Sequence, residues 1–175
     1  MSRSLAIYIT WLVGAASLAL LFTSLVIPVE LPIAIQVDGE PLRASVLETL
    51  LGLAFWTLVT VVASNLPVRL SDGVQVAVST APLMAAAVLG GPTAAAWVAL
   101  IGSTDGRELR RQVAWYGTLA NHAAIVLPVI VGALVIQLFR GSNGAIQELA
   151  ATLLGTLTYF VFNLVLVSLI VVIRH

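Results

Sequence analysis

The sequence predicts an all-α integral membrane protein: a six-helix transmembrane bundle with a short β-hairpin at the cytoplasmic interface, forming a single transmembrane domain over residues 1–175. Two observations predict this class. Hydrophobic residues make up 60% of the chain and charged residues 9%, and the mean hydropathy is +1.08, outside the range of soluble domains. A spanning helix needs about 20 apolar residues, so the length holds roughly six or seven spans and leaves no room for a soluble catalytic domain.

The expected spans cover approximately residues 5–27, 46–64, 76–89, 93–103, 118–139 and 149–173. The first run is longer than the 7 to 15 apolar residues or so of a signal peptide, so we interpret it as a retained helix. Gly90-Gly91-Pro92 separates the third and fourth spans and predicts a tight helical hairpin, because proline disfavours helix in the preceding residue. The fourth span is short for the bilayer, so it either continues through Asp105 and Arg107 or lies sheltered inside the bundle.

The arginines predict the orientation. All eight basic residues are arginine. A cytoplasmic N-terminus puts six of them inside, at positions 3, 69, 107, 110, 111 and 174, and two outside, at 43 and 140. We therefore expect a multi-pass protein of the cell inner membrane with both termini in the cytoplasm. Arg107, Arg110 and Arg111 dominate this bias, and we interpret their loop as a topology determinant that touches anionic lipid, with partner docking as the alternative.

A stretch between the second and third spans alternates like a β-hairpin. Residues 67–70 and 74–79 alternate apolar with small or polar side chains on either side of Ser71-Asp72-Gly73, and Asp-Gly is a favoured turn dipeptide. Irregular backbone is not tolerated against lipid, so this segment is expected at the interface or in a cavity enclosed by protein. The alternative is an ordinary loop followed by a helix from about Val74.

Four polar residues inside the spans are the candidate ligand-binding residues: Asn121, His122, Tyr159 and Asn163. Tyr159 and Asn163 are four residues apart and share a helix face. We predict that any pocket lies between the third, fifth and sixth spans. For Asn163 the alternative is a purely structural hydrogen bond between helices. His122 has only His175 as a second histidine, so no metal site is expected, and a structural or proton-sensitive role remains open.

The remaining motifs argue against catalysis. The chain carries no His-Glu-x-x-His, Gly-x-Ser-x-Gly or P-loop motif, so neither an enzyme nor a cofactor is expected. Asp105 and Glu108 are three residues apart but share their loop with three arginines, which are expected to neutralise them. The absence of cysteine removes thiolate metal sites, and the zero net charge gives no basic surface for nucleic acid.

A longer pattern resembles known membrane domains. The stretch NLPVRLSDGVQVAVSTAPLMAAAVLGGPTAAAWVALIG, the arginine-rich loop and the aromatic-Gly-x-x-x-Asn helix resemble the N-terminal membrane sensor domains of bacterial HD-GYP and GGDEF signalling proteins, over residues 65–131. The resemblance implies a sensory or regulatory input domain whose cytoplasmic output domain is absent from this chain or supplied by a partner. The same order of proline, glycine-containing turn, apolar run and Gly-Pro is more weakly similar to the S-components of energy-coupling-factor transporters.

Three functions therefore stay open: an input domain, a small-molecule-binding transporter subunit and a structural accessory subunit of a larger membrane complex. The partners expected from these readings are the lipid bilayer, an output domain or other membrane subunits, and a second copy of the chain. Nucleic acid is not among them.

Overall fold

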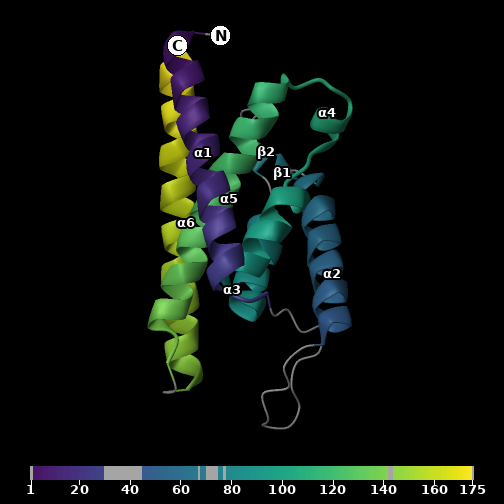
Figure 1. Cartoon of the computed structure of the whole chain (residues 1–175), viewed down its shortest axis with the longest axis vertical. Coiled ribbons are helices and arrows are strands. Elements are labelled where there is room, and N and C mark those ends of the chain that lie inside the picture. The colour runs from purple at the N-terminus through teal and green to yellow at the C-terminus, as the bar shows by residue number, and fades with distance from the viewer. Residues whose placement is uncertain are drawn as a thin grey trace.

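Five long helices, one short helix and two very short strands make up the described part of the chain (Figure 1). The computed structural model describes residues 2–29, 45–66, 68–69, 75–76, 78–141 and 144–174. The elements are α1 (Arg3–Val26), α2 (Val46–Ser64), β1 (Val68–Arg69), β2 (Gln75–Val76), α3 (Thr80–Gly102), α4 (Gly106–Leu109), α5 (Trp115–Phe139) and α6 (Ala145–Arg174). Figure 1 shows the two termini together at one end of the molecule, beside the paired ends of α1 and α6.

Local capping explains where the first two helices begin. The Oγ atom of Ser2 accepts a hydrogen bond from the backbone N–H of Leu5 at 3.3 Å. At α2, Ser45 and Glu48 form a reciprocal capping box, with the Ser45 N–H donating to Glu48 Oε2 at 2.7 Å and the Glu48 N–H donating to Ser45 Oγ at 3.2 Å. The carboxylate at the start of an otherwise apolar helix is therefore part of its cap.

Helix α3 turns back on itself at Gly91. The backbone there is not helical, with φ 71° and ψ −172°, and Pro92 follows. A straight helix would separate Ser79 from Ser103 by about 36 Å, yet both residues line one cavity. At the turn, Arg140 donates through Nη2 to the carbonyl of Val88 at 2.6 Å. The two halves of α3 therefore form a helical hairpin.

The hairpin changes the expected number of spans. Five helices among the described residues are long and apolar enough to cross a membrane, with α3 counted once, so the prediction of six spans is not confirmed. The third and fourth predicted spans correspond to the two halves of α3, each about 16 Å long, against a hydrocarbon core of about 30 Å. Neither half crosses such a core alone, because the chain reverses at Gly91 after eleven helical residues.

Strands β1 and β2 lie in the segment between α2 and α3. They pair antiparallel, with Val68 opposite Val76 and Arg69 opposite Gln75. The predicted turn over Ser71-Asp72-Gly73 lies outside the described residues. Helix α3 begins at Thr80, later than the start near Val74 that an ordinary loop and helix would give.

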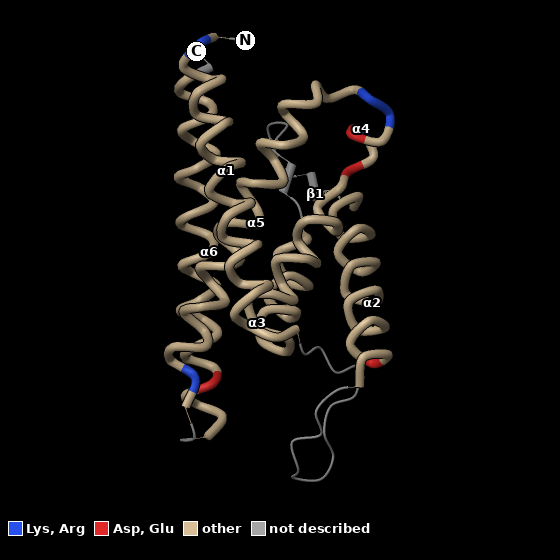
Figure 2. The backbone as a smooth tube through the Cα atoms, in the orientation of Figure 1, with Lys and Arg blue, Asp and Glu red and all other residues tan. Residues whose placement is uncertain are grey.

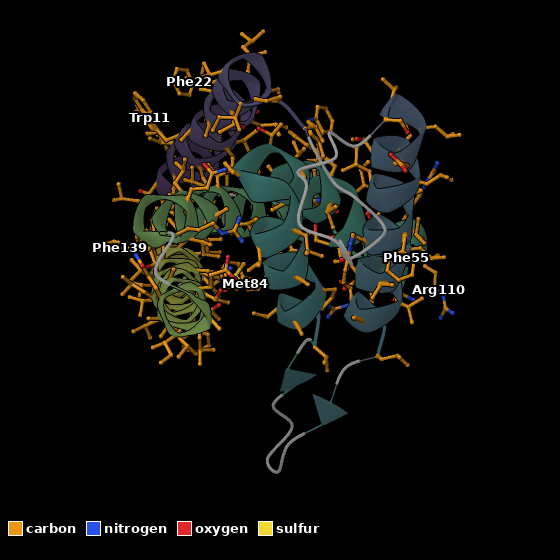
Figure 3. All side chains as sticks on the ribbon, turned by 90° about the horizontal axis from the view of Figure 1, so that it is seen from below. Trp11, Phe22, Phe55, Met84, Arg110 and Phe139 are labelled. Atoms are coloured by element: carbon orange, nitrogen blue, oxygen red, sulfur yellow. The ribbon has the colours of Figure 1, made fainter. Side chains whose placement is uncertain are left out.

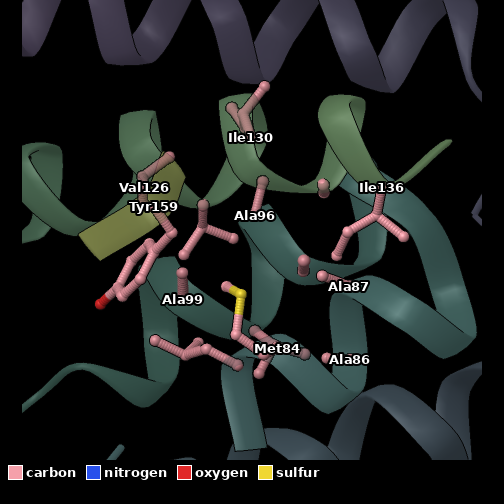
Figure 4. Close-up of a cluster of buried hydrophobic side chains, with 14 residues drawn as sticks. Met84, Ala86, Ala87, Ala96, Ala99, Val126, Ile130, Ile136 and Tyr159 are labelled. Atoms are coloured by element: carbon pink, nitrogen blue, oxygen red, sulfur yellow. The ribbon is translucent and has the colours of Figure 1, made fainter. Parts of the chain in front are cut away.

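The core lies where α3 packs against α5 and α6. Small and medium side chains fill it, among them Met84, Ala96, Val126 and Ile136, and they are shown together in Figure 4. Large apolar side chains point outward instead, as Figure 3 shows for Trp11, Phe22 and Phe139. Charged residues gather near helix ends and in the segment around α4 (Figure 2). Large apolar side chains on the outside and charged residues near the helix ends are what a bundle surrounded by lipid requires.

Candidate functional site

The segment between α3 and α5 is organised around Asp105. Its Oδ1 atom accepts the backbone N–H groups of Arg107 at 2.6 Å and Glu108 at 3.1 Å, which starts α4. The Nε and Nη2 atoms of Arg107 donate to Oδ2 at 2.9 and 2.7 Å. Burial raises the pKa of Asp105, but these hydrogen bonds outweigh it and hold the pKa below its ordinary 3.8. The negative charge of Asp105 is therefore matched by Arg107.

The end of α2 anchors this segment. Asn65 accepts the backbone N–H of Gly106 through Oδ1 at 2.7 Å and donates through Nδ2 to the carbonyl of Thr104 at 3.3 Å. Its neighbour Ser64 donates through Oγ to the carbonyl of Gly102 at 3.0 Å. Helix α2 therefore holds both the last turn of α3 and the first turn of α4.

Glu108 and His122 form a buried pair between α4 and α5. His122 Nε2 lies 2.9 Å from Glu108 Oε2, and the two side chains are only 13% and 6% exposed. Asn121, next to His122 on α5, donates through Nδ2 to Glu108 Oε1 at 3.2 Å. Two of the predicted site residues, Asn121 and His122, therefore contact the same carboxylate. We had expected the arginines of this segment to neutralise Glu108. That expectation is wrong for Glu108.

The His122 ring has partners at both nitrogens. Nδ1 lies 2.6 Å from the carbonyl oxygen of Leu100 and 3.0 Å from the hydroxyl oxygen of Ser103. Nε2 lies 2.9 Å from Glu108 Oε2 on α4. The ring therefore links α5 to α4 and to the end of α3.

A polar cavity of about 380 Å³ lies beside this pair. It opens between the end of α2, both ends of the α3 hairpin, α4 and the first turns of α5. Serine, asparagine, glutamine and arginine side chains dominate its wall. The polar residues that line it are Ser64, Asn65, Ser79, Ser103, Asp105, Arg107, Arg110, Gln112 and Asn121.

The other two predicted site residues lie deeper in the bundle. Tyr159 is buried in the core, and its Cβ lies 3.1 Å from the position that a Cβ on Gly132 would occupy. Asn163 donates through Nδ2 to the carbonyl of Ala124 on α5 at 2.8 Å. Neither residue lines the polar cavity, whereas Asn121 lines it and also a second cavity of about 430 Å³ between α1, α5 and α6. A role of Tyr159 and Asn163 in ligand binding stays a prediction.

The three predicted loop arginines occupy different positions. Arg107 is bound to Asp105, and Arg110 lines the polar cavity. Arg111 does not line it and adopts a left-handed backbone conformation with φ 56°. Neither Arg110 nor Arg111 forms an ion pair with another described residue. Of the three, Arg110 is therefore the one that lines the cavity without an ion-pair partner among the described residues.

Sequence reasoning missed Asn65, Ser79 and Glu108 as site residues. The Asp105-x-x-Glu108 spacing is typical of a helix start and could have suggested α4. Asn65 directly follows an apolar run, as a residue that ends a helix often does. Nothing in the sequence shows that these residues meet, because α2, α3 and α5 bring them together from distant positions.

Among the described residues, no cluster of three or more histidine, aspartate or glutamate side chains is arranged to hold a metal ion. The fold and the site define a helical membrane protein with a polar cavity near one end of its bundle. A comparison of the chain with protein-family models, curated proteins and solved structures finds no match.

Proposed function

We propose that this chain is a membrane-embedded sensory or regulatory input domain in which the polar cavity receives the signal and α6 passes it on. One observation carries the proposal: α5 bears His122 and Asn121, which hold the cavity segment through Glu108, and it also packs along α6. A conformational change at the cavity can therefore be transmitted through α5 to α6. The last residues of α6 lie beside the N-terminus (Figure 1).

The contact between α5 and α6 is close enough to transmit a shift. A Cβ on Gly132 would lie 2.7 Å from the carbonyl oxygen of Gly155, so the two backbones nearly touch. Asn163 adds a hydrogen bond to α5 eight residues further along α6. Packed helices tend to move as units between discrete arrangements, which is the behaviour that a signalling helix needs.

The arginine distribution supports a cytoplasmic position for the cavity and both termini. In this orientation the signal is a small polar molecule from the cytoplasm, and the output lies with a domain or subunit that contacts the end of α6. The protein itself would be a multi-pass component of a bacterial inner membrane.

A second candidate is a substrate-capture subunit of a transporter. The observation that favours it is the cavity itself, because a pocket of about 380 Å³ is within the size range of small-molecule sites. A capture subunit needs the segment over the cavity to open, but it does not need α6 to move relative to α2.

Spin labels distinguish these functions in a chain that has no native cysteine. One pair would be placed at Leu51 and Val172, on the exposed faces of α2 and α6, and a second pair at Leu51 and Leu109 of α4. His122→Ala breaks the pair with Glu108 and serves as the perturbation, with Leu119→Ala on the exposed face of α5 as the matched control.

An input domain predicts that His122→Ala changes both distance distributions. A capture subunit predicts a change between α2 and α4 only. If neither distance changes in a protein that keeps its helical circular dichroism, the chain behaves as a structural subunit and the proposal is wrong.

A further inference from the structure

Several helix ends lie at one level on the side of the bundle where α3 turns at Gly91. Thr93 Oγ1, just after this turn, lies 3.0 Å from the carbonyl oxygen of Ile27 at the end of α1. Arg140 follows α5, donates to the α3 backbone just before the turn and lies 3.9 Å from Glu148 in the first turn of α6. The end of α1, the end of α5 and the start of α6 are therefore beside the turn. We call this level the Gly91 end of the bundle and the opposite side the α4 end.

Helix α2 begins at the same level. A Cβ on Gly102 would lie 2.6 Å from the Cβ of Thr60, so these two residues are neighbours across α3 and α2. Gly102 lies about 16 Å from Gly91 along α3, and Thr60 lies about 18 Å from Glu48 along α2. The capped start of α2 therefore belongs to the Gly91 end. Figure 2 shows charged residues at the lower ends of both α2 and α6.

The helices stop at different levels at the α4 end. Helix α2 ends at Ser64, about 24 Å from Glu48. Helix α6 continues to Arg174, about 39 Å from Glu148, and α1 is about 35 Å long. Figure 1 shows α1 and α6 continuing past the end of α2. The bundle is therefore shorter on its α2 side by roughly 10–15 Å, and the whole difference lies at the α4 end.

The exposed side chains follow the same step. Large exposed apolar residues run from Val46 to Val62 on α2, but from Ile146 to Val172 on α6. Beyond the end of α2 the chain turns to the charged segment around α4, where the side chain of Arg107 is 70% exposed. The apolar surface that faces lipid is therefore lower on the α2 side than on the α6 side.

A flat bilayer cannot match both sides of this surface. A hydrocarbon core of about 30 Å, measured from the Gly91 end, extends past the end of α2 to the α4 charges and stops short of the last turns of α6. Tilting the whole protein does not help, because the helix ends are already level at the Gly91 end. A tilt that levelled the α4 end would displace those ends from the opposite interface.

We propose that the bilayer is thinner beside α2 and α4 than beside α6, and that the headgroup layer at the α4 end dips toward the bilayer centre there. The partner of this surface is the lipid headgroup layer of one leaflet. Bilayers adapt to a short apolar span by thinning at a modest cost, whereas a charge in hydrocarbon costs more. The inference does not depend on a ligand in the cavity or on which end of the bundle faces the cytoplasm.

Two exposed valines at matched heights test the thinning. Val62 on α2 and Val161 on α6 are 51% and 50% exposed. They lie about 21 Å and 20 Å from Glu48 and Glu148, so a flat bilayer puts them at the same depth. The full chain, as Val62→Cys or Val161→Cys with a bimane label, would be placed in phosphatidylcholine vesicles. The vesicles would contain lipids that carry a nitroxide quencher either at the headgroup or near the end of the acyl chain.

We expect the headgroup quencher to act more strongly on the label at Val62 and the chain quencher to act more strongly on the label at Val161. The ratio of headgroup to chain quenching should be about twofold higher, or more, at Val62, because thinning brings the headgroups close to this position. Equal ratios at the two positions would overturn the inference. An absence of quenching at Val62 by either lipid would also overturn it, because another protein surface or water would then cover this side.

A pair of carboxylates gives a second measurement without labels. Val161→Asp puts a charge in the hydrocarbon, whereas Val62→Asp puts the same charge close to the headgroups. In the same vesicles, Val161→Asp should therefore unfold at a lower temperature than Val62→Asp. Equal losses of thermal stability in the two variants would mean that both positions lie at one depth, and the bilayer would be flat around the protein.

Discussion

Asn163 on α6 donates its side-chain amide to the carbonyl of Ala124, the carbonyl that Pro128 leaves without a helical partner. In a regular helix the N–H four residues later would bind this carbonyl, but proline has none. An unbound carbonyl inside a membrane bundle is costly. The amide of Asn163, on the neighbouring helix, supplies the hydrogen bond that α5 lacks at this position. The hydrogen bond therefore explains both a proline inside a long helix and a polar residue in the middle of α6.

This relationship predicts a coupling between Asn163 and Pro128. Asn163→Leu should lower the free energy of unfolding by about 1 kcal/mol, the usual worth of such a hydrogen bond between membrane helices. In a Pro128→Ala background, the introduced alanine supplies its own N–H to the carbonyl of Ala124, and the cost of Asn163→Leu should shrink. A double-mutant cycle in detergent, followed by denaturant unfolding, measures this difference. An equal cost in both backgrounds would mean that the amide acts elsewhere.

A second prediction concerns the contact between α5 and α6. In Gly155→Val the new Cβ would lie 2.6 Å from the carbonyl oxygen of Gly132, so the helices must separate. We expect the variant to be less stable by roughly 1–3 kcal/mol. Gly14→Val on the exposed face of α1 is the control, because nothing lies within 4 Å of its Cβ position. Similar unfolding midpoints for the two variants would contradict the close packing.

The pair of Glu108 and His122 predicts that α4 loosens when the contact is removed. Glu108→Ala leaves Nε2 of His122 without its partner on α4. A spin label at Leu109 should then become more mobile. The pair of Asp105 and Arg107 is left unchanged in this variant.

Glu108→Gln is the matched control. The glutamine amide carries both a donor and an acceptor, so it can keep a hydrogen bond with Nε2, and the label at Leu109 should keep the mobility that it has in the wild type. If Glu108→Gln and Glu108→Ala loosen the label equally, this hydrogen bond does not hold α4.

The orientation predicts which faces a membrane-impermeant thiol reagent reaches. Single cysteines at Ser2 and Leu109 should be labelled from the cytoplasm, and a cysteine at Ile146, at the start of α6, from the opposite side. These positions are exposed and the chain has no other cysteine to interfere. Labelling of Leu109 and Ile146 from the same side would reject the orientation.

The class of fold was readable from local sequence. Uninterrupted apolar runs indicate membrane helices because each residue contributes its own transfer free energy, and α2 covers Val46–Ser64, the range of the second predicted span. The break at Gly90-Gly91-Pro92 was also local, since glycine and proline act on their own backbone. The two halves were predicted as a third span and a short fourth span, because the pattern does not show that Ser79 and Ser103 return to one cavity.

The partners of the polar residues were decided by the tertiary structure. Tyr159 and Asn163 share a helix face by their spacing, yet whether they meet a ligand or another helix depends on where α5 lies. Glu108 is surrounded by arginines in the sequence but pairs with His122 in space. Apolar length and backbone breaks act within a few residues of the chain, and they specify the helices. Pairing across helices depends on how the packed bundle brings distant residues together, and no local pattern encodes it.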